Sequence, residues 1–171
     1  MNTRMIEVEN LSFSYGRRKS KVLEDFSMKL DKGSVYGLLG KNGTGKSTLL
    51  YLMAGLLRPQ TGNVLYKGVD VKKRYPDTLQ DMFLVPEEFA LPNVSLKQYV
   101  KLNAPFYPNF SDELLNACLR DFDMNVDIHL GELSMGQKKK AFLCFALATN
   151  TSLLMMDEQT NGLDIPSQSQ F

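Results

Sequence analysis

Three features of the sequence predict an α/β fold. A short apolar run at 35–39, a glycine-rich turn and an apolar segment at 49–57 follow one another as strand, turn and helix. A second apolar run of strand length, 153–156, ends directly in Asp157 and Glu158. The carboxyl end of a buried strand is where an open α/β sheet places its ligand chemistry. A helical pattern at 141–148 precedes that strand, so the chain alternates between helices and buried strands.

The remaining elements follow from apolar periodicity and turn residues. Ser95 and Ser111 are suited to cap the helices that follow them. The segment 49–57 is apolar on nearly all sides and should be buried. Residues 87–130 are predicted to be a helical insertion between two strands of the sheet. Further strands are predicted at 5–13, 26–30, 64–66 and 83–85, and further helices at 95–102 and 111–119.

The composition is that of one soluble globular domain. Of the 171 residues, 43% are hydrophobic and 23% are charged, and the formal net charge is +1. This balance excludes a general electrostatic attraction to nucleic acid or anionic lipid. The N-terminus has no apolar signal region, and no run approaches the ~20 apolar residues of a membrane span. We therefore expect a single domain over 1–171 in the cytoplasm, with any membrane role exerted through a partner.

Two smaller features have plain structural interpretations. Cys118 and Cys144 are far apart in the sequence and form no C-x-x-C motif. We interpret them as structural thiols of a reducing compartment, without a disulfide framework. The three consecutive lysines at 138–140 are predicted to lie on a solvated helix face, with a role near a γ-phosphate as the alternative.

The glycine-rich turn has the pattern G-x-x-x-x-G-K-S. Because glycine lacks a Cβ, the backbone can wrap closely round an anion and adopt positive φ. The N–H groups of the loop and of the following helix then point at phosphates. Lys46 supplies a charge for the β- and γ-phosphates, and the Ser47 hydroxyl can ligate Mg²⁺. The alternative, a surface turn rich in Gly and Lys, is disfavoured by the flanking strand and helix. The predicted nucleotide-binding residues of this segment are Gly40, Lys41, Asn42, Gly43, Thr44, Gly45, Lys46, Ser47 and Thr48.

Asp157 and Glu158 supply the carboxylates that hydrolysis of a triphosphate requires. Asp157 suits Mg²⁺, directly or through water, because this hard cation prefers oxygen ligands. Glu158 suits a general base that polarises the attacking water. A solvated strand end is the alternative interpretation of such a pair, and the phosphate loop upstream makes it the weaker one.

A second anion site is indicated by Leu133-Ser134-Met135-Gly136-Gln137. A serine at a helix N-terminus followed by glycine offers a hydroxyl and unpaired N–H groups. Taken alone, Ser134 is more simply interpreted as an N-cap. One chain rarely needs two such sites for one triphosphate, whereas two chains that meet head to tail would use both.

Together these motifs resemble the ATP-binding-cassette (ABC) ATPases, in the right order over essentially the whole chain. Residues 40–47 resemble the Walker A motif, 133–137 the LSGGQ signature, and 153–158 the Walker B motif with its catalytic glutamate. Residues 161–164 resemble the D-loop, which implies a nucleotide-binding role for Asp164.

The family resemblance also gives a role to Tyr15, in Phe13-Ser14-Tyr15-Gly16 upstream of Walker A. It lies where the family places the aromatic residue that stacks on adenine. The alternative is a strand residue with a packed ring.

The resemblance implies a RecA-like α/β core with an antiparallel β subdomain and a helical subdomain at about 87–130. It further implies that two such domains sandwich two ATP molecules, each held by Walker A of one chain and the signature of the other. Closure on ATP and opening after hydrolysis would drive a membrane permease, docked at the helical subdomain and the loop 86–88. The implied cofactors are ATP and Mg²⁺. The implied partners are the permease and a second ATPase domain, without nucleic acid, at the inner face of the cell membrane.

The sequence departs from the family pattern at several positions. Glu87 stands where a Gln usually senses Mg²⁺, and its carboxylate can still ligate the metal. Met135 replaces the first signature glycine, and Gln159 replaces the proline that follows the catalytic glutamate. The family's switch histidine belongs downstream of the D-loop, whereas His129 precedes the signature and the sequence stops at Phe171. We therefore expect a cassette truncated after the D-loop, lacking the terminal core strands.

The leading functional hypothesis is the ATPase subunit of a membrane transporter, because the spacing is compact and the helical insertion short. Glu87 resembles exporter-type cassettes and favours export weakly. A soluble ABC ATPase of DNA maintenance or translation is the main alternative, but the chain has neither long coiled-coil insertions nor tandem cassettes, and its charge is neutral. A chain that binds ATP with little turnover is a third possibility.

Overall fold

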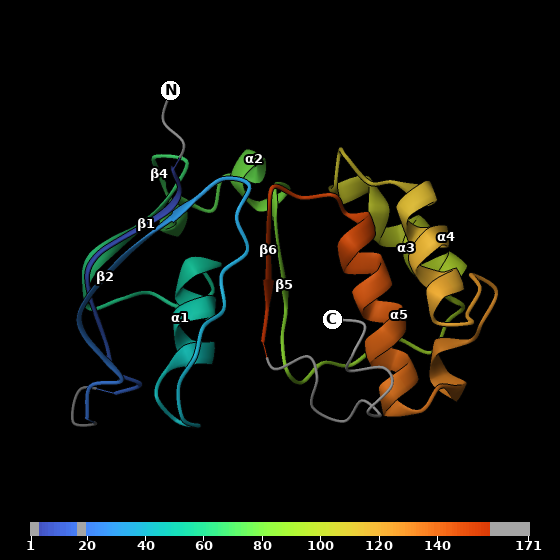
Figure 1. Cartoon of the computed structure of the whole chain (residues 1–171), viewed down its shortest axis with the longest axis horizontal. Helices are drawn as coiled ribbons and strands as arrows, with labels where there is room; N and C mark the ends of the chain where they lie inside the picture. Colours follow the sequence, from blue (N-terminus) through green and yellow to red (C-terminus); the bar gives the residue numbers. More distant parts are fainter. Residues whose placement is uncertain (1–3, 17–19, 158–171) are drawn as a thin grey trace. The chain divides into compact units, whose positions relative to one another are not determined.

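The computed structural model describes residues 4–16 and 20–157 of the chain. The polypeptide forms two compact units, residues 1–79 and residues 80–171. The first contains a four-stranded antiparallel sheet and the second a two-stranded parallel sheet, each with its own helices (Figure 1). The predicted α/β class and the predicted antiparallel β subdomain are confirmed.

The sheet of the first unit has the strand order β2-β1-β3-β4. Its strands are β1 (Arg4–Phe13), β2 (Leu23–Asp31), β3 (Thr61–Tyr66) and β4 (Val69–Asp70). The central strand β1 buries Ile6 and Val8 before a register shift and Leu11 and Phe13 after it. Side chains alternate along a strand, so one extra residue is needed to keep all four on the buried face. Asn10, with φ 45°, lies within this irregularity.

The helix that follows the glycine-rich turn begins and ends earlier than the predicted 49–57. The helical elements of this unit are α1 (Lys46–Met53), the 3₁₀ turn η1 (Val71–Lys73) and α2 (Pro76–Leu79). α1 packs on β3 and buries Leu49 and Leu52. The predicted burial of the whole segment to residue 57 is wrong, because Leu56 is 57% exposed. Gly55 adopts φ 67°, and the N–H of Leu56 donates to the carbonyl of Tyr51 at 2.9 Å, which ends the helix in a Schellman motif.

The apolar run at 35–39, predicted to be a buried strand, forms no strand in the structure. Val35 and Leu39 are 102% and 93% exposed. A strand requires a neighbour for its backbone N–H and C=O groups. In the described part of the chain, no strand pair includes this run, and the hydroxyl of Tyr36 accepts a hydrogen bond from the N–H of Asp31 at 3.0 Å. The prediction is wrong here because apolar character indicates burial without specifying the neighbour that provides it.

In its described residues, 80–157, the second unit combines a parallel strand pair with three α-helices. Its elements are β5 (Met82–Val85), α3 (Leu96–Asn103), the 3₁₀ turn η2 (Ala104–Phe106), α4 (Asp112–Asp121), the 3₁₀ turn η3 (Leu130–Glu132), α5 (Met135–Ala148) and β6 (Leu153–Met156). Ser95 and Ser111 cap α3 and α4 through their side-chain oxygens, as predicted. α5 begins six residues earlier than the predicted 141–148, so the Ser-Met-Gly-Gln segment and the apolar helix belong to one element.

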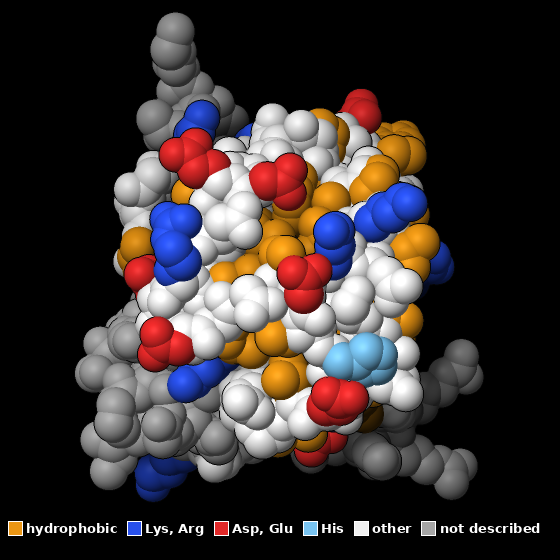
Figure 2. All heavy atoms as spheres, turned by 90° about the vertical axis from the view of Figure 1, so that its right-hand side faces the viewer, with side chains coloured by type: hydrophobic (Ala, Val, Ile, Leu, Met, Phe, Trp, Pro, Cys, Tyr) orange, Lys and Arg blue, Asp and Glu red, His pale blue; other side chains and the backbone are white. Residues whose placement is uncertain are grey.

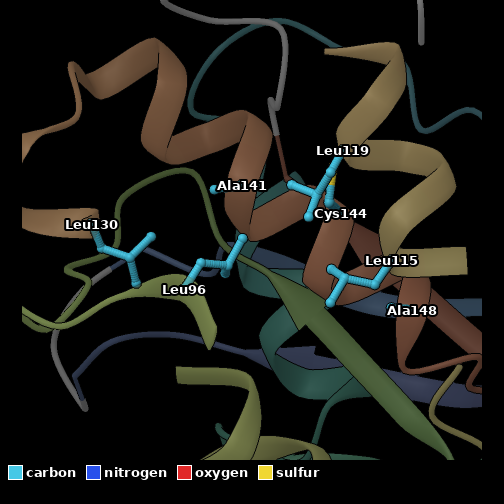
Figure 3. Close-up of a cluster of buried hydrophobic side chains, with 7 residues drawn as sticks. All are labelled: Leu96, Leu115, Leu119, Leu130, Ala141, Cys144 and Ala148. Carbon is cyan, nitrogen blue, oxygen red and sulfur yellow. The ribbon is translucent and has the colours of Figure 1, made fainter. Parts of the chain in front are cut away.

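Two apolar clusters form the core of the second unit. In the first, buried side chains join α3, α4, α5 and η3 (Figure 3). Its members are Leu96, Leu115, Leu119, Leu130, Ala141, Cys144 and Ala148. In the second, Phe145 contacts the rings of Tyr99 and Phe110 with centroids 5.0 and 5.5 Å apart, and Phe83 of β5 lies 6.0 Å away. α5 is therefore buried on most of its sides.

The lysines at 138–140 do not share one solvated face, so that prediction is wrong. Lys139 is buried, and Lys140 is half-buried with its Nζ 5.4 Å from the ring centroid of Phe122. Successive residues of an α-helix point about 100° apart. Three consecutive lysines on a helix buried on most sides therefore cannot all face water, and long side chains lie along the apolar surface instead.

The face of the second unit on the side of α3 and α4 has a mixed surface (Figure 2). Apolar side chains lie between acidic and basic ones on this face. The exposed large apolar residues of α3, η2 and α4 include Leu102, Phe106 and Leu114, at 67%, 69% and 44%.

Replacing Leu115 by alanine should destabilise the protein by about 2–5 kcal/mol, because this side chain is 1% exposed within the α4–α5 cluster. The matched control is Leu114→Ala on the same helix, which should change stability by about 0.5 kcal/mol or less. Urea unfolding followed by circular dichroism measures both. Equal losses in the two variants would contradict this packing.

Candidate nucleotide-binding site

The glycine-rich turn is an exposed loop that leads directly into α1. Gly43 and Gly45 adopt φ 81° and 94°, and Gly45 is the N-cap of the helix. A Cβ on Gly45 would lie 2.9 Å from Cγ1 of Val22. The left-handed backbone and this close approach both require glycine. Because Gly45 has no side chain, it cannot cap the first N–H groups of α1. These N–H groups are then available to bind an anion.

Lys46, the first residue of α1, folds back over the loop. Its ammonium donates to the carbonyl oxygens of Gly40 and Lys41 at 2.9 and 3.1 Å. The hydroxyl of Thr44 donates to the same Lys41 carbonyl at 2.8 Å. These hydrogen bonds join the two ends of the loop and hold the Lys46 ammonium against the loop backbone.

Tyr15, just beyond β1, lies against α1. Its hydroxyl is 2.9 Å from Oγ1 of Thr48, which is buried, whereas Tyr15 is 56% exposed. The ring of Phe13 packs edge-on with centroids 5.0 Å apart. The side-chain amide of Gln60 donates to Oγ of Ser14 at 2.8 Å and ties the same segment to the turn before β3. Sequence reasoning did not identify Gln60 as a support, because a polar residue in a turn gives no signal of its distant partner.

Asp157 and Glu87 lie at the same end of the parallel sheet. Val85 pairs with Met156, and the N–H of Asp157 donates to the carbonyl of Val85 at 3.0 Å. Glu87 follows two residues after the end of β5. Asp157 is 3% exposed, and Glu87 is half-buried. This strand end therefore offers one buried and one half-buried carboxylate, and carboxylate oxygens are ligands that Mg²⁺ prefers.

The predicted Mg²⁺ ligands Ser47, Asp157 and Glu87 offer oxygen atoms, the donors this cation prefers. No three His, Cys, Asp or Glu side chains converge as a potential metal site in the part of the chain that the structure describes. Mg²⁺ fits such a sparse set, because it usually keeps several waters and substrate phosphates beside one or two carboxylates. Ser47 belongs to the first unit, and the two carboxylates belong to the second, where they follow the paired ends of β5 and β6.

The Ser-Met-Gly-Gln segment forms the exposed N-terminus of α5. Ser134 is the N-cap, and its Oγ accepts from the N–H of Gln137 at 3.3 Å. The side chain of Gln137 accepts from the N–H of Ser134 at 3.0 Å, which completes a capping box. Met135 is 59% exposed despite its apolar side chain, and Gly136 is half-buried. The helix start is thus well defined and open to solvent.

Two predicted site residues, Glu158 and Asp164, lie outside the described residues. The general-base role of Glu158 and the D-loop role of Asp164 stay predictions, as does the effect of Gln159.

The loop before α1 and the carboxylate at the end of β6 follow each other in the order of a nucleoside-triphosphate-binding domain. The model of the ABC transporter family matches residues 23–161, a span that begins in β2 and extends past β6. The chain belongs to this family, and the resemblance inferred from its motifs is confirmed.

Several curated proteins are similar to this chain. The ABC transporter ATP-binding protein YtrB of Bacillus subtilis is 32% identical over 94% of this chain and 54% of its own length. The zinc uptake system ATP-binding protein ZurA of Listeria innocua is 32% identical over 98% of this chain and 69% of its own length. The SkfA peptide export ATP-binding protein SkfE of Bacillus subtilis is 29% identical, over 96% and 70%. The chain therefore spans about half of YtrB and somewhat more of the other two.

The fold is also found among solved structures. An ATP-binding subunit of an ABC transporter superposes with a TM-score of 0.83 at 28% identity, covering 94% of this chain and 69% of that one. This agreement confirms the predicted fold class. Among the described residues, no helix has both the length and the apolar character needed to cross a membrane.

Replacing Gly45 by alanine should destabilise the protein by about 1–3 kcal/mol more than replacing Gly33. Both glycines have positive φ, but a Cβ at Gly33 meets no atom within 4 Å, whereas a Cβ at Gly45 meets Val22. Thermal unfolding of the two variants gives the difference. Equal shifts of the melting temperature would show that Val22 does not constrain the start of α1.

Proposed function

We propose that this chain is the ATP-binding and ATP-hydrolysing subunit of an ABC transporter, and that it powers substrate movement through a separate membrane permease. One observation carries the proposal: a left-handed Gly45 starts α1 abruptly, and the Lys46 ammonium lies against the loop. Membership of the family supports it.

In the proposed site, the N–H groups at the start of α1 and of the loop bind phosphate oxygens. Lys46 exchanges its two carbonyl partners for oxygens of the β- and γ-phosphates, a stronger charge-assisted pairing. The exposed ring of Tyr15 stacks on adenine, and its hydroxyl, held by Thr48, fixes the ring's orientation beside α1.

Ser47, Asp157 and Glu87 are the proposed metal-binding residues. When bound, Mg²⁺ neutralises the charge that develops on the transferred phosphoryl group. Glu158 accepts a proton from the attacking water, and Asp157 would hold the cation directly or through water. Burial of Asp157 at the end of β6 fixes the position of that carboxylate.

A second ATPase domain completes the proposed site. The N-terminus of α5, with Ser134, Met135, Gly136 and Gln137, would contact the γ-phosphate held by Walker A of a second copy in a head-to-tail dimer, with Asp164 at the same interface. The exposed Met135 supports this proposal, because an apolar side chain at an open helix start is covered when a partner binds.

The permease is proposed to dock on the helical segment 87–130 and the loop 86–88. Exposed apolar side chains such as Leu102 and Phe106 support a protein-binding role for this segment. The protein would then work at the inner face of the cell membrane, held there by the permease alone. Relatives include proteins named for uptake and for export, and we favour export only because Glu87 occupies the Mg²⁺-sensing position.

Lys46→Ala should weaken ATP binding by about 10–100-fold, because the charge that pairs with the phosphates is lost. Lys32→Ala, in the exposed turn before the loop, is the matched control and should bind normally. Titration with a fluorescent ATP analogue measures both affinities. Unchanged affinity in Lys46→Ala would remove this residue from the proposed site.

Glu158→Gln should keep ATP affinity and slow hydrolysis by roughly 10²–10⁴-fold, because the amide cannot accept the proton of the attacking water. Release of inorganic phosphate gives the rate, and Glu113→Gln, an exposed acid of α4, serves as the control. Wild-type turnover in Glu158→Gln would exclude the general-base role.

A further inference from the structure

Two thiols lie side by side between α4 and α5. The thiol of Cys144 donates to Sγ of Cys118, with the two sulfur atoms 2.7 Å apart, and both cysteines are free. They are the only two cysteines of the chain. A covalent S–S bond is about 2.05 Å long, so little movement separates this thiol pair from a disulfide.

The packing of the two helices explains why these thiols meet. Ala141 and Ala148 lie about one turn before and one turn after Cys144, and both are fully buried. Small side chains on this face allow α4 to approach closely. Leu115 and Leu119 of α4 are buried against the same cluster on either side of Cys118, and Figure 3 shows Cys144 beside Leu119. The pair therefore lies beside the buried cluster that joins α4 and α5.

The two thiols differ in accessibility and acidity. Cys118 is half-buried, whereas Cys144 is fully buried. The hydrogen bond from Cys144 lowers the pKa of the Cys118 thiol, although burial and Asp121 oppose this. The same hydrogen bond, together with burial, raises the pKa of the Cys144 thiol. An external reagent therefore meets Cys118 first, and Cys144 is positioned to react second.

We propose that Cys118 and Cys144 form a thiol–disulfide exchange site, which a small external disulfide converts into one intramolecular disulfide that ties α4 to α5. The Cys118 thiolate attacks one sulfur of the external disulfide and releases one thiol. The sulfur of Cys144 then attacks Sγ of Cys118 and releases the second thiol. The two protein thiols are oxidised, the external disulfide is reduced to two thiols, and the two protons end on those thiols.

The crosslink would close a segment that contains the Ser-Met-Gly-Gln start of α5. Residues 134–137 lie between Cys118 and Cys144 in the chain. Joining the ends of this segment removes conformational freedom from the unfolded chain, so the oxidised protein should unfold at higher urea concentration. The proposal rests on the second unit alone and does not depend on ATP turnover.

The test is equilibration of the full chain with oxidised and reduced glutathione, with and without denaturing urea. Intact mass and thiol titration give the fractions of dithiol, mixed disulfide and intramolecular disulfide. The equilibrium constant for the intramolecular disulfide should be at least on the order of ten-fold higher in the native protein than in urea, because folding holds the sulfurs together. Cys118→Ser should leave Cys144 unreactive in the native state, and Cys144→Ser should stop at the mixed disulfide on Cys118.

Three results would overturn the proposal. The first is an equal or lower equilibrium constant in the native protein. The second is a covalent dimer between chains as the main product. The third is rapid reaction of Cys144 in the native Cys118→Ser variant. Circular dichroism of both serine variants, and of Cys118→Ala, establishes that the comparison is made on folded protein.

Discussion

The start of α1 and the end of β1 hold each other through a closed circuit of contacts, on which the site in the first unit depends. Gly45 lies against Val22, whose N–H donates to the carbonyl of Phe13 at 2.8 Å. The ring of Phe13 packs on Tyr15, and the hydroxyl of Tyr15 returns to Thr48 on α1. Each contact is weak alone, but the circuit fixes the phosphate loop and the aromatic residue relative to one another. Position 45 must be glycine for these contacts to form, because a Cβ there would clash with Val22.

In the second unit, parallel pairing has a similar consequence for the acidic residues. Parallel strands end at a common edge, so the register of β5 with β6 brings the residues after Val85 and Met156 to the same place. Asp157 is buried and adds one backbone hydrogen bond to the strand pair beyond Met156. Glu87 lies outside the strand pair, because β5 ends at Val85. These two carboxylates are therefore suited to different tasks. The buried Asp157 is suited to hold a cation in a fixed position, and the less buried Glu87 is suited to contact the cation or the waters around it.

The sequence predicted most of the elements and motifs, and its errors have identifiable causes. Local signals were sufficient for the caps Ser95, Ser111 and Ser134, because a capping serine acts within three residues of itself. The predicted strand at 35–39 is wrong, because apolar character is a local property, whereas the neighbouring strand that a sheet requires is not. The proximity of Cys118 and Cys144 was missed for the same reason, because it depends on how α4 packs on α5. Contacts made across the fold leave little trace in one sequence.

The capping box at α5 restricts which residue can serve at position 134 in the proposed composite site. Aspartate and asparagine cap helices as well as serine does. An aspartate would repel a phosphate, because its carboxylate is negatively charged and has no proton to donate. The Ser134 hydroxyl accepts from the N–H of Gln137 through a lone pair and still has its own proton to donate. Capping the helix and donating to a phosphate oxygen are therefore compatible in one serine side chain. The capping role of Ser134 therefore does not compete with its proposed role in phosphate binding. The capping hydrogen bond holds the side-chain oxygen in place, and the hydroxyl proton is left for the phosphate.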